Sequence, residues 1–147
     1  MTTDAHHVTS PHPEGEGMMR AMTLALADAG IDAGAVDYVN AHGTGTLQND
    51  RTEALAIARV FGAGRVPMSS TKSLVGHTMA AAGSVEAAAT VLALRHGLIP
   101  PTANLGAVDP EIPFDCVPIT ARPAPLEIAL SNSFGFGGQN VSLIFRR

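Results

Sequence analysis

The segment from Met79 to His96 constrains the fold most strongly, because the helix that it predicts has almost no polar face. Alanine, valine and leucine occupy most positions from Met79 to Leu94, and Gly97 ends the pattern. With Glu86 inside it, the run is too short and too rich in alanine to span a bilayer. A helix that is apolar nearly all round is normally buried between other layers. We therefore expect a layered fold around one buried helix.

The other segments alternate between helix and strand patterns. Helices are predicted over Met18–Ala29, which stops at Gly30, and from an N-cap at Asn49 or Asp50 to Phe61. The predicted strands are short apolar or alternating segments, namely Val36–Asn40, Val66–Ser70, Ile128–Ser133 and Val141–Phe145. This order predicts an α/β fold with a mixed sheet, helices on its faces, and a final antiparallel hairpin with an enlarged loop. The proline-rich stretch 100–125 is expected to be mostly irregular.

Charge is scarce in this chain of 147 residues: charged residues make up 15%, against a usual share of about 25%. A small domain needs more charge than this to cover its surface, so part of the surface is expected to be buried against another chain or segment. The net charge of −4 disfavours a nucleic-acid-binding protein, which would be basic, and no basic run indicates a membrane partner.

The chain reads as one domain over residues 1–147. Its single cysteine cannot form an internal disulfide, and the polar opening Met1–Pro13 does not resemble a signal peptide. A cytoplasmic protein is therefore expected.

Two glycine-rich turns attract attention, at residues 42–46 and 134–138. The first lacks the third glycine of a dinucleotide fingerprint and the second lacks the lysine of a nucleotide loop, so neither predicts phosphate binding. His42 instead stands at a predicted strand end, where flanking glycines let a ligand approach the backbone. The sequence equally allows a simpler interpretation, in which neighbouring backbone satisfies this histidine.

A second group of polar residues precedes the apolar helix. Lys72 is the only lysine, and His77 is predicted at the helix start, where the dipole opposes protonation of an imidazole. A neutral imidazole there could donate a hydrogen bond to a developing oxyanion; a capping histidine and a surface lysine are the alternatives. Glu86 would be costly to bury unless it meets a backbone group or a cation, which indicates a structural role.

Five motifs together resemble the β-ketoacyl-acyl-carrier-protein synthases, most closely the type II elongating condensing enzymes. They are residues 4–11, Asn40–Thr46, Ser70–His77 with Ala81–Gly83, Pro100–Leu105 and Asn132–Gly138, in family order along nearly the whole chain. The resemblance implies the C-terminal half of a thiolase-like fold. It also implies decarboxylative Claisen condensation of malonyl-acyl carrier protein with an acyl thioester, in fatty-acid or polyketide synthesis.

The resemblance also implies a role for individual residues. His42 and His77 would donate hydrogen bonds to the malonyl thioester oxygen, and Lys72, paired with Glu53, would orient the site. The remaining residues would bind substrate or support the site: Thr44 and Thr46 at the phosphopantetheine arm, Phe134 and Phe136 at the acyl pocket, and Asp4 as a nearby carboxylate. The arm arrives on acyl carrier protein, so no resident cofactor or metal is expected.

The chain departs from the family in lacking its nucleophilic cysteine, which belongs to the N-terminal half. Cys116 follows Asp115 in a proline-rich connection, and a neighbouring carboxylate raises the pKa of a thiol, so Cys116 is predicted to be inert. His6, His7 and His12 lack regular ligand spacing and are predicted to be solvated or packed in a loop. His96 suits the helix C-terminus.

Three hypotheses follow. The first is a half-enzyme that is competent only with its N-terminal half, within a homodimer of the full enzyme. The second is a non-catalytic partner subunit that sets chain length in a heterodimeric ketosynthase. The third is a stand-alone module that binds a pantetheine-linked acyl group.

Overall fold

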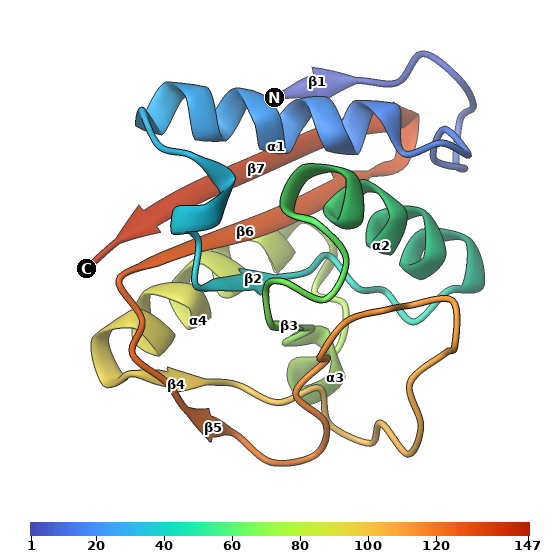
Figure 1. Cartoon of the computed structure of the whole chain (residues 1–147). Coiled ribbons are helices and arrows are strands. Elements are labelled where there is room, and N and C mark those ends of the chain that lie inside the picture. The colour runs from blue at the N-terminus through green and yellow to red at the C-terminus, as the bar shows by residue number, and fades with distance from the viewer.

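A five-stranded mixed sheet forms the centre of the computed structural model, which describes residues 1–147 (Figure 1). In spatial order its strands are β1 (Thr2–Thr3), β7 (Gln139–Arg146), β6 (Ile128–Gly135), β2 (Tyr38–Asn40) and β3 (Met68–Ser69). Strand β2 is parallel to β3 and β6, whereas β7 is antiparallel to β6 and β1. The predicted mixed α/β architecture and the predicted C-terminal hairpin are confirmed.

Helices cover both faces of the sheet (Figure 1). One face carries α1 (Glu16–Ala29) and α2 (Leu47–Phe61), and the other carries α4 (Ala82–His96). The remaining elements are short: η1 (Ala33–Ala35), α3 (Lys72–Val75), η2 (Met79–Ala81), η3 (Phe136–Gly138), and the separate pair β4 (Leu98–Ile99) and β5 (Arg122–Pro123). None of the helices combines the length and the apolar character that a membrane span requires.

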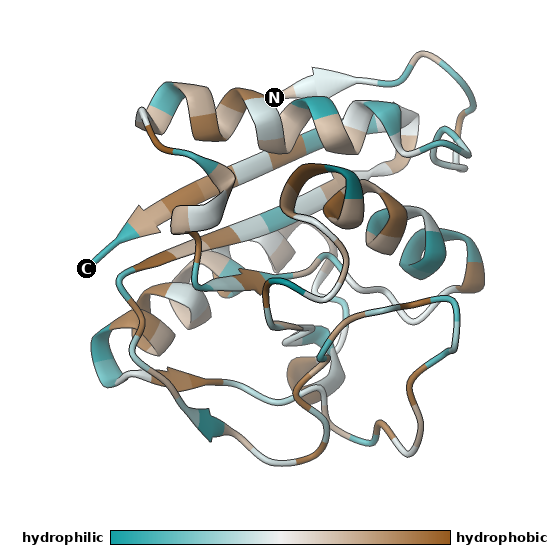
Figure 2. Ribbon diagram, in the orientation of Figure 1, coloured by the Kyte–Doolittle hydropathy of each residue, from teal (hydrophilic) through white to brown (hydrophobic).

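The core is divided by the sheet into two clusters. Adjacent residues of a strand point to opposite faces, and β2 shows this directly. Val39 packs in the larger cluster with Met22 of α1 and Ile57 of α2, whereas Tyr38 packs in the smaller cluster with Leu94 of α4. Figure 2 shows hydrophobic residues recurring along the strands and the flanking helices. Strands buried on both faces have near-continuous hydrophobic sequences, which explains the short runs recognised in the sequence.

Helix α4 differs from its prediction in two respects. It begins at Ala82, after the η2 turn, so His77 does not stand at the helix start. It is also not buried all round, because only one of its faces lies against the sheet. Glu86 and Thr90 are buried on that face, whereas Val91 and Leu92 remain 46% and 51% exposed.

Smaller corrections concern the ends of elements. Helix α2 begins at Leu47 because the hydroxyl of Thr46, not Asn49 or Asp50, caps it by accepting the Asn49 N–H. Strands β2 and β3 are shorter than predicted, and the sequence did not indicate β1, β4 or β5. Strands β6 and β7 are longer than predicted. Gly137 and Gly138 adopt φ of 78° and 75°, which allows the tight η3 turn between them.

The topology brings three chain segments to one edge of the sheet. Strands β3 and β6 are both parallel to β2, so the carboxyl ends of all three strands lie at this edge. The loop after β2 carries His42, the turn after β3 carries Lys72 and His77, and β6 ends at Phe134 and Gly135. This edge is where α/β folds place their ligand sites.

Candidate functional site

A cleft of about 680 Å³ opens at the carboxyl ends of β2 and β3. Its walls are the Gly43–Thr46 part of the histidine loop, the turn from Ser70 to His77, and the segment from Thr102 to Ile112. Lys72 and His77 line the cleft directly, and the buried His42 adjoins both of them. The three predicted catalytic residues are therefore brought together.

The backbone of the histidine loop is fixed by a buried carboxylate. Glu53 of α2 accepts the backbone N–H of His42 on Oε1 and that of Gly43 on Oε2, each at 2.9 Å. The side-chain amides of Asn49 and Asn132 add hydrogen bonds at 3.4 and 3.2 Å. Burial raises the pKa of Glu53, and the backbone and Asn132 hydrogen bonds oppose that rise. Glu53 borders the cleft, but both of its carboxylate oxygens are occupied by backbone N–H groups, so its role is to support the histidine loop.

Gly43 allows the histidine loop to lie close to the turn after β3. Its φ is +42°, and a Cβ built there would approach the Ser70 Cβ to 2.5 Å. The Ser70 hydroxyl in turn donates to the Gly43 carbonyl at 2.7 Å. A side chain at position 43 would push the two walls of the cleft apart.

Lys72 connects the two sides of the site. Its Nζ donates to the carboxylate of Glu86 on α4, to the His42 carbonyl at 2.5 Å, and it lies 3.1 Å from His42 Nδ1. The predicted pairing of Lys72 with Glu53 is wrong, because Glu53 is occupied with backbone N–H groups on the other side of the loop. The prediction that the buried Glu86 has a cation or a backbone group as its partner is confirmed, because it forms an ion pair with Lys72.

The contact with Lys72 determines which nitrogen of His42 carries the proton. An ammonium group has three donors and no acceptor, so His42 Nδ1 accepts and the proton of the neutral ring lies on Nε2. Burial, together with the nearby positive charge of Lys72, lowers the pKa of His42 to about 3. His42 is therefore a neutral Nε2–H donor at physiological pH.

His77 reaches the same tautomer by a different route. It is exposed in the loop before η2, and its Nδ1 accepts the backbone N–H of Met79 at 3.2 Å. Met79 adopts a φ of +53°, an uncommon conformation for a residue with a side chain. An imidazole that accepts on Nδ1 carries its proton on Nε2. The site thus has two imidazole donors of the same kind.

The two imidazoles lie against each other. The ring centroids of His42 and His77 are 5.7 Å apart and the rings are nearly perpendicular. The ring of Phe134, at the end of β6, lies 5.7 Å from His42 on another side. Phe134 is 8% exposed, whereas Phe136 in the η3 turn is 74% exposed. Of the two predicted pocket residues, Phe134 therefore packs beside the His42 ring, whereas Phe136 lies at the surface.

The two predicted threonines line the cleft. Thr44 and Thr46 hydroxyls lie 2.9 Å from each other, and Thr46 also caps α2. Asp4 lies away from the histidines: its carboxylate accepts the His12 backbone N–H and the Asn140 amide, and it hydrogen-bonds to none of the three central residues. It fastens the N-terminal segment to the start of β7.

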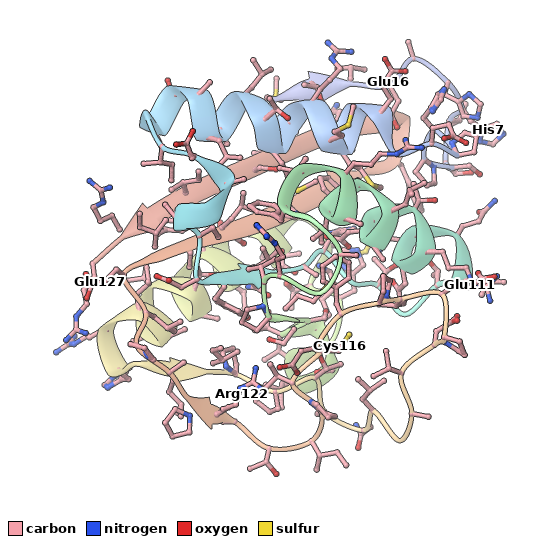
Figure 3. The ribbon with its side chains drawn as sticks, in the orientation of Figure 1. His7, Glu16, Glu111, Cys116, Arg122 and Glu127 are labelled. Atoms are coloured by element: carbon pink, nitrogen blue, oxygen red, sulfur yellow. The ribbon has the colours of Figure 1, made fainter.

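Other sequence candidates have ordinary environments. Cys116, which Figure 3 labels on the connection between β4 and β5, borders the cleft, and its thiol donates to the Phe114 carbonyl at 3.6 Å. Burial, with Asp115 and Asp50 adding to the effect, raises its pKa to about 11. The rings of His6 and His12 pack edge to face at 5.0 Å, and His7 Nδ1 accepts two backbone N–H groups. No three metal-ligating side chains gather in the structure.

Sequence reasoning assigned no role to Asn132. Its side chain is fully buried, and it links Glu53 to the hydroxyl of Ser142. The one signal available was an asparagine inside a predicted apolar strand, since such a residue requires a partner.

Comparisons with known proteins agree with this geometry. A family model described as "Beta-ketoacyl synthase, C-terminal domain" matches residues 1–106. A 3-oxoacyl-[acyl-carrier-protein] synthase 2 from Synechocystis sp. is 48% identical over all of this chain and 36% of its own length. The chain thus spans about a third of the length of this relative.

Two solved structures are closely similar. The ishigamide ketosynthase/chain length factor has a TM-score of 0.95 and 43% identity, over 99% of this chain and 36% of that one. The second is the AntDE:AntF complex, a type II polyketide acyl carrier protein with its ketosynthase bound to the hexaketide. Its TM-score is 0.94 at 36% identity, over 98% of this chain and 36% of that one. The fold is therefore that of the thiolase-like ketosynthases.

Gly43→Ala is expected to destabilise the fold more than Gly45→Ala. Both glycines have positive φ, so the backbone strain is shared, but only a Cβ at position 43 meets the Ser70 side chain. The overpacking should add roughly 1–3 kcal/mol to the loss in unfolding free energy, measured by urea denaturation of both variants. If both variants lose the same unfolding free energy, the loop relaxes around the added methyl group and the overpacking argument is wrong.

The depressed pKa of His42 predicts acid sensitivity. The unfolded chain takes up a proton at His42 near pH 6.5 and the folded chain only near pH 3, so falling pH favours unfolding. Between pH 7 and pH 5 the wild-type chain should lose about 2 kcal/mol of stability relative to His42→Gln. The measurement is the unfolding free energy of both proteins from urea titrations at each pH. If it changes with pH equally in the wild type and in His42→Gln, a neutral buried His42 is contradicted.

Proposed function

The chain belongs to the β-ketoacyl synthase C-terminal domain family, and from this premise we propose that it is the decarboxylating half of a β-ketoacyl-acyl-carrier-protein synthase. In this proposal His42 and His77 activate malonyl held as a thioester on acyl carrier protein. The observation that supports the proposal most directly is the pair of adjoining imidazoles, in each of which Nδ1 is engaged by a neighbouring group and Nε2 is left to donate.

The proposed reaction uses both donors at one oxygen. As the bond between the malonyl carboxylate and Cα breaks, carbon dioxide leaves and the electron pair moves into the thioester as an enolate. Two Nε2–H groups aimed at that oxygen stabilise the developing negative charge, and neither has to lose a proton first. The enolate carbon then attacks an acyl thioester on a cysteine, a carbon–carbon bond forms, and the cysteine thiolate departs.

The nucleophile in this proposal comes from a segment outside these 147 residues. Cys116 is buried with a raised pKa, the opposite of an activated thiolate. The chain spans about a third of its curated relative, and α4 leaves Val91 and Leu92 exposed. An apolar helix face of this kind is suited to packing against another layer. We therefore expect no condensation by the 147 residues alone.

The cleft is the proposed route for the phosphopantetheine arm. Thr44 and Thr46 place hydroxyls along one wall, where they would hydrogen-bond the arm's amides. The exposed Phe136 would close over the acyl chain, with Gly137 and Gly138 allowing that movement. In this account acyl carrier protein is the partner, no resident cofactor is needed, and the complete enzyme is a cytoplasmic homodimer.

A chain-length partner subunit is the second candidate. It is favoured by the similarity to a ketosynthase/chain length factor and by the lack of a usable nucleophile in the chain. Such a subunit has no use for two imidazole donors of matched tautomer. The catalytic proposal accounts for His42, His77 and Lys72 together and is preferred for that reason.

His77→Ala in the complete synthase should slow malonyl decarboxylation by on the order of 10²- to 10³-fold, because one oxyanion donor is lost. Acylation of the nucleophilic cysteine should remain within about 2-fold, because that step does not use the malonyl oxygen. Release of carbon dioxide from radiolabelled malonyl-acyl carrier protein and a mass measurement of the acyl-enzyme would separate the two steps.

His96→Ala, at the exposed end of α4, is the matched control and should change neither step. If His77→Ala slows acylation as much as decarboxylation, the assigned role is wrong. If the wild-type synthase releases no carbon dioxide, the partner-subunit candidate replaces the catalytic one.

A further inference from the structure

The end of β6 contacts both of the buried carboxylates that support His42, and the His42 ring as well. Three consecutive residues there, Asn132, Ser133 and Phe134, contact in turn Glu53, Glu86 and the His42 ring itself. Adjacent side chains on a strand point to opposite faces of the sheet. Asn132 therefore reaches the carboxylate from α2 on one face, and Ser133 reaches the carboxylate from α4 on the other.

The contact through Glu53 acts on the backbone. Asn132 Nδ2 donates to Glu53 Oε1 at 3.2 Å, and the same oxygen accepts the His42 N–H at 2.9 Å. Glu53 itself holds the Asn132 amide in this orientation, because a turned amide would place Oδ1, an acceptor, against the carboxylate. In the present orientation Oδ1 accepts the Ser142 hydroxyl at 2.7 Å. Asn132 thus fixes the carboxylate that fixes the backbone of His42 and Gly43.

The contact through Glu86 acts on the ring. The Ser133 hydroxyl lies 3.4 Å from Glu86 Oε2, while Glu86 Oε1 binds Lys72, which in turn contacts His42 Nδ1. This hydrogen bond is longer than that of Asn132. Together, the contacts of Asn132 with Glu53 and of Ser133 with Glu86 form a clamp on the histidine loop. The contact with Glu53, which holds the backbone, is the shorter of the two, so Asn132 is the main member of the clamp.

We propose that Asn132 is a positioning residue for the decarboxylation: through Glu53 it sets the backbone at His42, and hence the direction in which His42 Nε2–H points. The inference rests on the proposed function for its catalytic consequence, although the positioning itself can be measured without turnover. A merely structural Asn132 would satisfy Glu53 and stabilise the fold, but its loss would not act selectively on the oxygen-binding step.

The clamp also predicts a change in pH dependence. A protonated Glu53 must donate one hydrogen, yet both backbone groups facing it are donors, so protonation would displace the loop. Burial and the charge of Asp50 on α2 raise the pKa of Glu53, whereas the Asn132 amide lowers it. The other titratable groups facing this region are His42 itself and, beyond it, Lys72 with Glu86; α1 presents Met22.

The test compares Asn132→Ala with Ser142→Ala in the complete synthase. Ser142 is the register partner of Asn132 on β7, so its variant removes a hydrogen bond from the same network but leaves the Asn132–Glu53 contact. Asn132→Ala should slow decarboxylation about 10-fold, less than the direct loss of a donor. It should leave acylation within about 2-fold and move the acid limb of the decarboxylation profile to higher pH, because Glu53 then protonates more readily. Ser142→Ala should lose as much thermal stability as Asn132→Ala, but its decarboxylation rate and the acid limb of its pH profile should stay at the wild-type values.

Hydrogen–deuterium exchange measures the positioning independently of activity. The peptide covering residues 40–46 should exchange faster in Asn132→Ala and at the wild-type rate in Ser142→Ala. Unchanged exchange, an unshifted acid limb, or equal effects in the two variants would overturn the proposal. An inactive wild-type synthase with faster exchange in Asn132→Ala would refute the proposed function but retain the clamp.

Discussion

The site depends on one buried ammonium group. Lys72 lies between the Glu86 carboxylate and His42, where it neutralises a charge that would otherwise be costly to bury and forces His42 Nδ1 to act as an acceptor. Burial and that positive charge keep the ring neutral. This one contact therefore decides the tautomer of His42 and adds to the burial that keeps its ring neutral.

The fold supplies this contact from distant parts of the chain. Lys72 follows β3, Glu86 belongs to α4, and His42 follows β2, yet parallel pairing brings them to one edge of the sheet. Helices on opposite faces each contribute a buried glutamate, so that the histidine loop is held from both sides. This arrangement leaves the solvent-facing loop after Lys72 free to carry the second imidazole, which its own backbone orients.

The sequence predicted the elements whose physical cause is local. Apolar spacing ending at a glycine located α1 and the end of α4, and short apolar or alternating segments located β2, β3 and the hairpin. It could not identify the partner of Lys72, because both Glu53 and Glu86 were available and only the crossing of helices on either side of the sheet decides between them. It also overestimated the burial of α4, since its composition does not reveal what covers each face. Asn132 was missed because its partners lie on α2 and β7, far apart in the sequence.

The most direct test of this account is the protonation state of the two imidazoles. Long-range ¹H–¹⁵N correlation spectra of the ¹⁵N-histidine-labelled protein at neutral pH distinguish the tautomers from each other and from the imidazolium form. His42 and His77 are both expected to carry their single proton on Nε2. In Lys72→Met the proton of His42 should be free to occupy either ring nitrogen, while His77 stays unchanged. A His42 ring that is protonated on Nδ1 or charged in the wild-type protein would contradict this account.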